Sequence, residues 1–296
     1  TQSVDNKIFT IDPAAAAQVA FTTEPAGTAT AGADLSTQPV VTIQDSYANT
    51  IVLSSDNVTL AAFTDVGCTA AAGGALSATA NPKAATAGVA TFAAMNYDLA
   101  ETIYLKASSG PLTVDCSTAI VVSPAAAAKV VYTTDPSATG TAGVDFAAQP
   151  VVEIRDAFEN VVTTSSDTVV LSAFTTADCS TTTSTGTSNG ISKAASSGIS
   201  TFTALNHEKA ESVYFKASSG GLTTDCSTVS AVDPAAATKV VYTTQPAATG
   251  TAGADLSTQP IVEVQDAFSN TVTSSSDTIT IAGYTNVGCT AASGGT

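Results

Sequence analysis

The sequence predicts an all-β protein made of tandem β-sandwich domains, and three observations support that prediction. A block of about 110 residues recurs along the 296-residue chain. Apolar and polar residues alternate within each block, and clusters of Gly, Pro, Asn and Asp separate the alternating segments. A block of this length is close to the commonest domain size, so each is expected to fold as a domain of its own.

The repeat is clearest at its opening. The run Pro-Ala-Ala-Ala begins at Pro13 and returns at Pro124 and Pro234, 111 and 110 residues later. Each opening is followed by a similar segment, QVAFTT in the first unit and KVVYTT in the second and third. The expected domains are a terminal strand of a preceding or neighbouring unit (1–12), unit one (13–123), unit two (124–233) and an incomplete unit three (234–296).

Alternation with a period of two indicates strands. In VVEIRD, Val152 and Ile154 share one face while Glu153 and Arg155 share the other. About seven short strands per unit favour an immunoglobulin-like sandwich. The alternative, a helix over Pro13–Ala17, is disfavoured because four alanines cannot nucleate one. The strands expected in unit two lie near 129–134, 150–156, 161–164, 167–174, 199–205, 211–218 and 222–232.

The joints between units are short. The last strand of unit one runs through Pro124 and four alanines directly into the first strand of unit two. Proline fixes φ, and no flexible Gly/Ser linker intervenes. We therefore expect the tandem domains to form an elongated, stiff rod.

The five cysteines keep the repeat's register. The simplest pairing is Cys68 with Cys116 and Cys179 with Cys226, and free buried thiols are the alternative. Each disulfide would contribute about 4 kcal/mol by loop-closure entropy. Paired cysteines imply an oxidising, extracellular location. Cys289 is then unpaired or available to another subunit.

Unit three stops seven residues after Cys289. Half a sandwich exposes its inner face and sheet edges. We expect the 296 residues to be a segment of a longer repetitive polymer. The alternative is completion in trans, because residues 4–13 resemble the closing segment 114–124. The residues expected to be donated in that case are Val4, Ile8, Phe9 and Ile11.

Composition excludes several classes of protein. Nine Lys and Arg face 25 Asp and Glu, giving a net charge of −16, which argues against nucleic-acid binding. No apolar run is long enough to span a membrane as a helix. The single His207 excludes repeated histidine chemistry, and we expect it on the surface. No Gly-rich phosphate loop or zinc-ligand spacing is present, so no cofactor is expected apart from calcium.

Calcium is the one metal considered, at a recurring acidic turn. Asp45, Asp156 and Asp266 each precede an Asn by four residues, which is typical of a structural turn. The alternative is calcium held at a domain joint with further oxygen ligands. Those further ligands would be Asp56, Asp167 and Asp277.

Two charged pairs also recur at matching strand positions. Glu101 and Lys106 in unit one correspond to Glu211 and Lys216 in unit two. Solvated strand faces are expected for all four, and a lysine–asparagine isopeptide crosslink is the alternative.

The segments TQPVVTIQD and QDAFSNTV resemble tandem immunoglobulin-like repeats of bacterial surface proteins, namely invasin/intimin-type repeats and large repeat adhesins. Such repeats usually carry Asp-x-x-Gly-Asn at this turn, whereas Ala48, Glu159 and Ser269 replace the glycine here. The regular cysteine pair is a further departure. The resemblance implies a spacer or filament role outside the cell.

Together these observations predict a non-enzymatic, extracellular structural protein. It would form the shaft of a cell-surface filament or adhesin, with copies of itself or further repeats as partners. The alternative is a module that binds carbohydrate or a receptor through loops 69–87 and 180–198, which differ most between the units.

Overall fold

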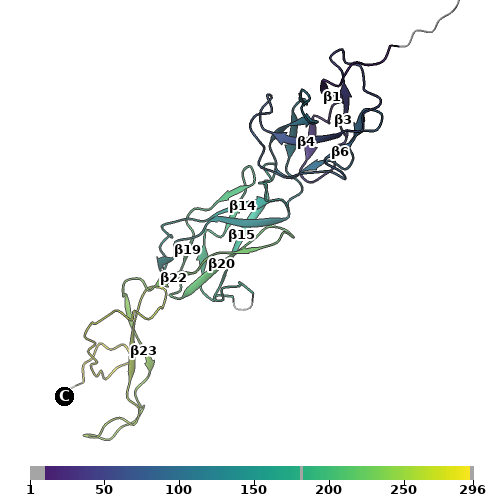
Figure 1. Cartoon of the computed structure of the whole chain (residues 1–296). Coiled ribbons are helices and arrows are strands. Elements are labelled where there is room, and N and C mark those ends of the chain that lie inside the picture. Colours follow the sequence, from purple (N-terminus) through teal and green to yellow (C-terminus); the bar gives the residue numbers. More distant parts are fainter. Residues whose placement is uncertain (1–10, 181–182, 294–296) are drawn as a thin grey trace, which may run out of the picture.

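The computed structural model describes residues 11–180 and 183–293, and every regular element among them is a β-strand (Figure 1). The all-β, immunoglobulin-like prediction is confirmed, and the expectation of no helix over Pro13–Ala17 holds because these residues form no regular element. The strands of unit one are β1 (Gln18–Thr23), β2 (Thr28–Thr30), β3 (Val40–Gln44), β4 (Asn57–Phe63), β5 (Leu76–Ser77), β6 (Lys83–Ala84), β7 (Val89–Thr91), β8 (Asn96–Tyr97), β9 (Thr102–Ser108), β10 (Asp115–Cys116) and β11 (Ile120–Ser123).

Unit two repeats this order strand for strand. Its strands are β12 (Lys129–Thr134), β13 (Thr139–Thr141), β14 (Val151–Arg155), β15 (Thr168–Phe174), β16 (Ser188–Asn189), β17 (Ser192–Ala194), β18 (Ile199–Thr201), β19 (Asn206–His207), β20 (Ser212–Ser218), β21 (Asp225–Cys226) and β22 (Ser230–Asp233). Unit three contributes β23 (Lys239–Thr244) and β24 (Ile261–Gln265).

Two main sheets make each complete unit, and a further two-stranded sheet is present in each, β5-β8 in unit one and β16-β19 in unit two. In unit one a sheet of order β1-β3-β7 faces a sheet of order β2-β11-β9-β4-β6. Unit two has the corresponding sheets β12-β14-β18 and β13-β22-β20-β15-β17. The alternation read from the sequence is visible in β20, where Val213, Phe215 and Ala217 are buried.

Each complete unit has its own core. One cluster of buried residues runs from Val19 to Val122 and another from Val130 to Val232. Large apolar side chains such as Phe92 and Phe215 are almost fully removed from water. Burial of apolar surface is the main force that stabilises each unit.

Some predicted strand boundaries are wrong. Residues 161–164 form a turn rather than a strand, with one bridge from Arg155 to Val161. The segment predicted at 199–205 ends as a strand at Thr201, and that at 222–232 divides into β21 and β22. The short strand β13 was not predicted, because its sequence Thr-Gly-Thr has no apolar alternation and it exists by parallel pairing with β22.

Unit three keeps its first hairpin. Strands β23 and β24 pair in the register of β12 and β14, with Lys239 opposite Gln265 where Lys129 faces Arg155. Its apolar side chains are nevertheless exposed, as for Val240 and Ile261. In the described part of the chain no helix is long and apolar enough to cross a membrane.

Candidate functional site at the joints between units

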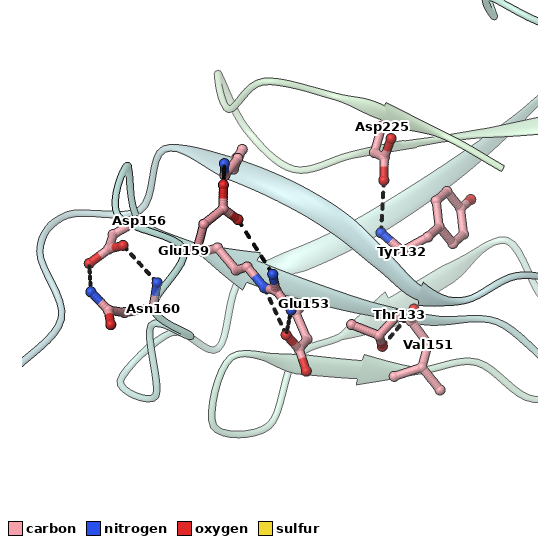
Figure 2. Close-up of polar contacts among 10 residues, drawn as sticks. Tyr132, Thr133, Val151, Glu153, Asp156, Glu159, Asn160 and Asp225 are labelled. Carbon is pink, nitrogen blue, oxygen red and sulfur yellow. Dashed lines mark hydrogen bonds and ion pairs between the residues drawn. The ribbon is translucent and has the colours of Figure 1, made fainter. Parts of the chain in front are cut away.

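The joint turn after β14 connects the two complete units. We use "joint turn" for the segments 156–160, 266–270 and 45–49, one in each unit. Asp156 is fully buried. Its Oδ1 accepts hydrogen bonds from the backbone N–H of Phe158 at 2.8 Å and of Asn160 at 2.9 Å. Its Oδ2 accepts from the Asn160 side chain at 2.9 Å (Figure 2). The same oxygen accepts from the Ala125 N–H in the linker at 2.8 Å. One carboxylate thus fixes both the turn and the linker after Pro124.

The fourth residue of each joint turn has a left-handed backbone. The φ angles are 65° at Ala48, 74° at Glu159 and 72° at Ser269. Glycine adopts this conformation at low cost and other residues do not. The residues at these three positions therefore adopt a backbone that glycine would adopt at lower cost, and the turn keeps the same shape in all three units.

Asn160 bridges the two units. Its Nδ2 donates to the backbone oxygen of Asp98 at 2.8 Å, and its Oδ1 accepts from the N–H of Ala100 at 2.8 Å. Both partners belong to unit one, and Asn160 is only 5% exposed. A buried amide that satisfies two backbone groups of a neighbour fixes orientation as well as distance.

An aromatic ring completes the joint. The Phe158 ring lies over Gly32, where a Cβ atom would fall 2.0 Å from Cζ of that ring. Gly32 also has a φ of +71°, so this position needs glycine for its backbone and for the ring. We call Gly32, Gly143 and Gly253 the joint glycines. They share the motif Thr-Ala-Gly, a recurring signal in the sequence that marks this position.

The second joint repeats the first contact for contact. Asn270 donates to the backbone oxygen of Glu208 and accepts from the N–H of Ala210, each at 2.8 Å. Phe268 lies over Gly143, where a Cβ would fall 2.1 Å from its ring. Asp266 accepts from the linker N–H of Ala235 at 2.9 Å.

The carboxylates of the joint turns are held in their charged form. Burial alone would raise the pKa of Asp45, but hydrogen bonds from Asn49, Ala14 and Tyr47 outweigh it and lower the pKa to about 2. The same balance lowers the pKa of Asp156 and of Asp266. Such bonds favour the ionised carboxylate over the neutral acid.

These geometries bear on the calcium hypothesis. The oxygens of Asp45, Asp156 and Asp266 are occupied by protein hydrogen bonds, as in a structural turn. Asp56, Asp167 and Asp277 bond instead to the serine two residues before each of them. Within residues 11–180 and 183–293 no group of three His, Cys, Asp or Glu side chains could hold a metal ion. Calcium at the joint stays an untested alternative to the structural turn.

The structure joins the cysteines in the pairs read from the sequence. Cys68 bonds to Cys116 with a Cα–Cα distance of 6.3 Å, and Cys179 bonds to Cys226 with 6.0 Å. Cys289 is free and exposed. Of the residues expected to be donated, Val4, Ile8 and Phe9 lie outside the described residues, while Ile11 is exposed.

Lys106 and Lys216 are not simply solvated. The Nζ of Lys106 donates to the backbone oxygen of Cys68 at 3.3 Å and lies 4.7 Å from the centre of the Phe63 ring. Lys216 does the same with Cys179 and Phe174. Each lysine therefore supports the loop that carries its disulfide through a hydrogen bond, and contacts the preceding strand through a cation–π interaction.

The expectation that His207 lies on the surface is wrong. Its side chain is fully buried, with Nδ1 2.8 Å from Ser188 Oγ and Nε2 3.1 Å from Glu211 Oε1. In unit one Tyr97 occupies this place and its hydroxyl donates to Glu101. Glu101 and Glu211 thus each follow a buried aromatic ring by four residues and satisfy its polar atom. This shared spacing is a signal in the sequence that the ring at position 97 or 207 is buried. Having no exposed surface, His207 has a structural role here.

Comparisons with known proteins identify no family. A scan against protein-family models and a search of curated proteins found no match. Among solved structures, the chain is similar to the Yersinia pseudotuberculosis adhesin InvE, with 15% identity and a TM-score of 0.29 over 70% of this chain. It spans 56% of that InvE chain.

Two further structures are similar at the same low level. Yersinia pseudotuberculosis InvD has 13% identity and a TM-score of 0.36, covering 86% of this chain and 71% of InvD. Extracellular domains 3–5 of Drosophila OTK have 10% identity and a TM-score of 0.30, covering 81% of this chain and 72% of OTK.

Proposed function

We propose that this chain is a non-enzymatic structural segment of an extracellular filament or adhesin, in which sandwich units are held end to end as a stiff shaft. The observation that carries the proposal is the joint. The same asparagine, aromatic ring, glycine and carboxylate contacts occur between units one and two and between units two and three. Because the same residues make the same contacts at both joints, we infer that they hold neighbouring units in a fixed orientation, which a flexible tether would not do.

The disulfides support the extracellular part of the proposal. Structural disulfides persist in oxidising compartments and are rare in the cytosol. Each complete unit places one of them across two segments 48 or 47 residues apart in sequence. The high negative charge would also limit nonspecific association between shafts.

Small-angle X-ray scattering of the full chain tests the shaft. The joint predicts a narrow distribution of distances between the units. It also predicts that the maximum dimension of the chain does not change with salt. Replacing Phe158→Ser together with Asn160→Ala removes the ring and the bridging amide of the first joint. We expect a broader distance distribution for this double variant. The matched control is Tyr47→Ser with Asn49→Ala, the equivalent pair in unit one, measured at high dilution. Equal scattering from both variants would refute the shaft.

The finer part of the proposal is assembly by strand complementation. Segment 4–12 would supply the last strand of unit three in another copy, pairing with residues 249–251. The support is the sequence likeness of 4–13 to 114–124. In unit two the equivalent residues form β13 by pairing with β22, whereas 249–251 are not a strand. Ile8→Asp should abolish association between copies, as measured by sedimentation, and unchanged association would exclude donation.

A further inference from the structure

Parallel strand pairs tie the two ends of each complete unit together. Strand β11, which leads into the linker, pairs parallel with β2, the second strand of unit one, and β22 pairs in the same way with β13 in unit two. In such a pair the chain enters at one end and leaves at the other. Tension between the two ends of a unit therefore loads the hydrogen bonds of the pair together, in shear, and does not open them one after another.

The first strand of each unit is attached in a similar way. In unit two the Val130 N–H donates to the backbone oxygen of Thr223 at 3.0 Å, and the Tyr132 N–H donates to the Asp225 carboxylate at 2.9 Å (Figure 2). Strand β12 runs parallel to this segment where it bridges Thr223. Unit one repeats these bonds between β1 and residues 113–115. The strand that enters a unit and the strand that leaves it are thus both held in shear.

The disulfide offers tension a direct route past part of each unit. Cys68 and Cys116 are 48 residues apart in sequence, and Cys179 and Cys226 are 47 apart. Cys68 follows β4, and Cys116 ends β10, directly before the exit strand β11. Once the outer strands have separated, the force passes through the bond between the two sulfur atoms. Strands β5 to β9 then lie in a closed loop that carries no tension, as do β16 to β20 in unit two.

This closed loop holds much of the core of its unit. In unit two Phe202, Leu205 and Phe215 lie within it and are almost fully buried. Lys216, also in the loop, donates to the backbone oxygen of Cys179 at 3.3 Å. The disulfide keeps the ends of the loop together after the outer strands have come apart, so refolding does not need to close that loop again.

We propose that the disulfide of each complete unit is a load-bearing bond, which limits how far the unit extends when tension separates its outer strands. The inference rests on the proposed shaft function, since a shaft is pulled from both ends. With the bond closed, tension releases only the residues outside the loop. With the bond open, tension also releases the loop, whose ends are 48 or 47 residues apart, and the chain gains about 160 Å of contour length per unit.

Force-clamp spectroscopy of the full chain, held at its two termini, tests the load path. In oxidising buffer the chain should extend in steps that leave both loops closed. Dithiothreitol added at constant force should then produce two further steps of about 160 Å each, because its thiolate attacks one Sγ, the S–S bond breaks and the other Sγ leaves as a thiolate. Absence of these steps, with mass spectrometry showing both bonds reduced, would overturn the proposal.

Double variants identify the unit to which each step belongs. Cys179→Ser with Cys226→Ser should lengthen the first extension step of unit two by about 160 Å and leave a single dithiothreitol-dependent step, that of unit one. Cys68→Ser with Cys116→Ser is the matched variant in unit one. Steps of the same length with and without the cysteines would contradict the load path.

Two further outcomes remain distinguishable. A variant unit that fails to fold loses its first step, and the dithiothreitol-dependent step of the other unit then decides the proposal. The shaft is judged separately, by scattering without tension. A flexible joint would refute the shaft while the dithiothreitol-dependent steps persist, and absence of those steps would refute the load-bearing bond while the joint stays rigid.

Discussion

Strands β12 and β23 have the same sequence, KVVYTT, and the same pairing register, but opposite burial. Val130 in β12 is 1% exposed, and Val240 at the same place in β23 is 57% exposed. The difference lies in what faces them. Strand β12 packs against β20 and β21, and the Tyr132 hydroxyl donates to the backbone oxygen of Phe215 at 3.0 Å. The pairing of a hairpin is thus set by its own two segments, whereas burial depends on the opposite sheet.

The joint turns, in contrast, are equally buried in units two and three. Asp156 and Asp266 are both fully buried, although one unit is complete and the other is not. Their bonds go to their own turn, to the linker and, through the following asparagine, to the preceding unit. A turn satisfied by local and upstream partners does not need the rest of its own sandwich.

Removal of a disulfide gives the largest expected difference between units two and three. Cys179→Ser with Cys226→Ser should lower the free energy of unfolding of unit two by about 4 kcal/mol, because a loop-closing link is lost from the unfolded chain. Cys289→Ser should change unit three by less than about 0.5 kcal/mol, as surface substitutions usually do. Hydrogen exchange measured by mass spectrometry in urea resolves the units. Equal effects of the two replacements would contradict the comparison.

The matched valines give the next largest effect. Val130→Ala should destabilise unit two by about 2 kcal/mol, since it removes two buried methyl groups and leaves a cavity. Val240→Ala should cost less than about 0.5 kcal/mol at its exposed site. Exchange protection of the amides in β12 and β23 measures each change. A large loss at Val240 would mean that β23 is covered in solution.

Acid tests the turn that both units share. The pKa of Asp45 is lowered from 3.8 to about 2 in the folded chain. Its contribution to stability is therefore fully present above about pH 4 and is lost as the pH falls toward 2. Asp45→Asn should make unit one less stable at neutral pH and flatten its decline between pH 4 and 2. Thermal unfolding across this range measures both, and an unchanged slope would assign the decline to other carboxyl groups.

The smallest expected effect is a gain in the stability of unit one. Ala48→Gly should stabilise unit one by about 0.5 kcal/mol, because release of the left-handed strain slightly exceeds the added backbone entropy. Ser269→Gly should also relieve the strain in unit three, but its gain in stability should be smaller because the hydrogen bond that Lys239 donates to Ser269 is lost. Ala62→Gly, near the end of β4, is the control and should destabilise unit one. A loss at Ala48 would show that its methyl group has a packing role.

Sequence reasoning reached the repeat, the sandwich and the cysteine pairs because each depends on a periodic pattern. It failed at β13, whose Thr-Gly-Thr becomes a strand only beside β22, and at His207, where a polar side chain is buried by neighbours distant in sequence. One part of the joint could be predicted from the sequence, because the turn that begins with Asp and ends with Asn recurs in each unit. The pairing of Phe158 with Gly32 could not be read although both positions recur in each unit, because the two residues belong to different units and the sequence does not show which surfaces of neighbouring units meet.

By itself, then, the sequence determined most of the segments that extend, where the chain turns and that the pattern occurs three times. These properties follow from interactions between residues that are close along the chain. They also follow from the alternation of apolar and polar residues, which is expected of any strand with one buried face. Only the tertiary structure decided which copy of the same strand is buried and which side chains lock one unit to the next. Those outcomes depend on surfaces that meet in space, and a sequence repeated in each unit cannot specify them until its neighbours are in place.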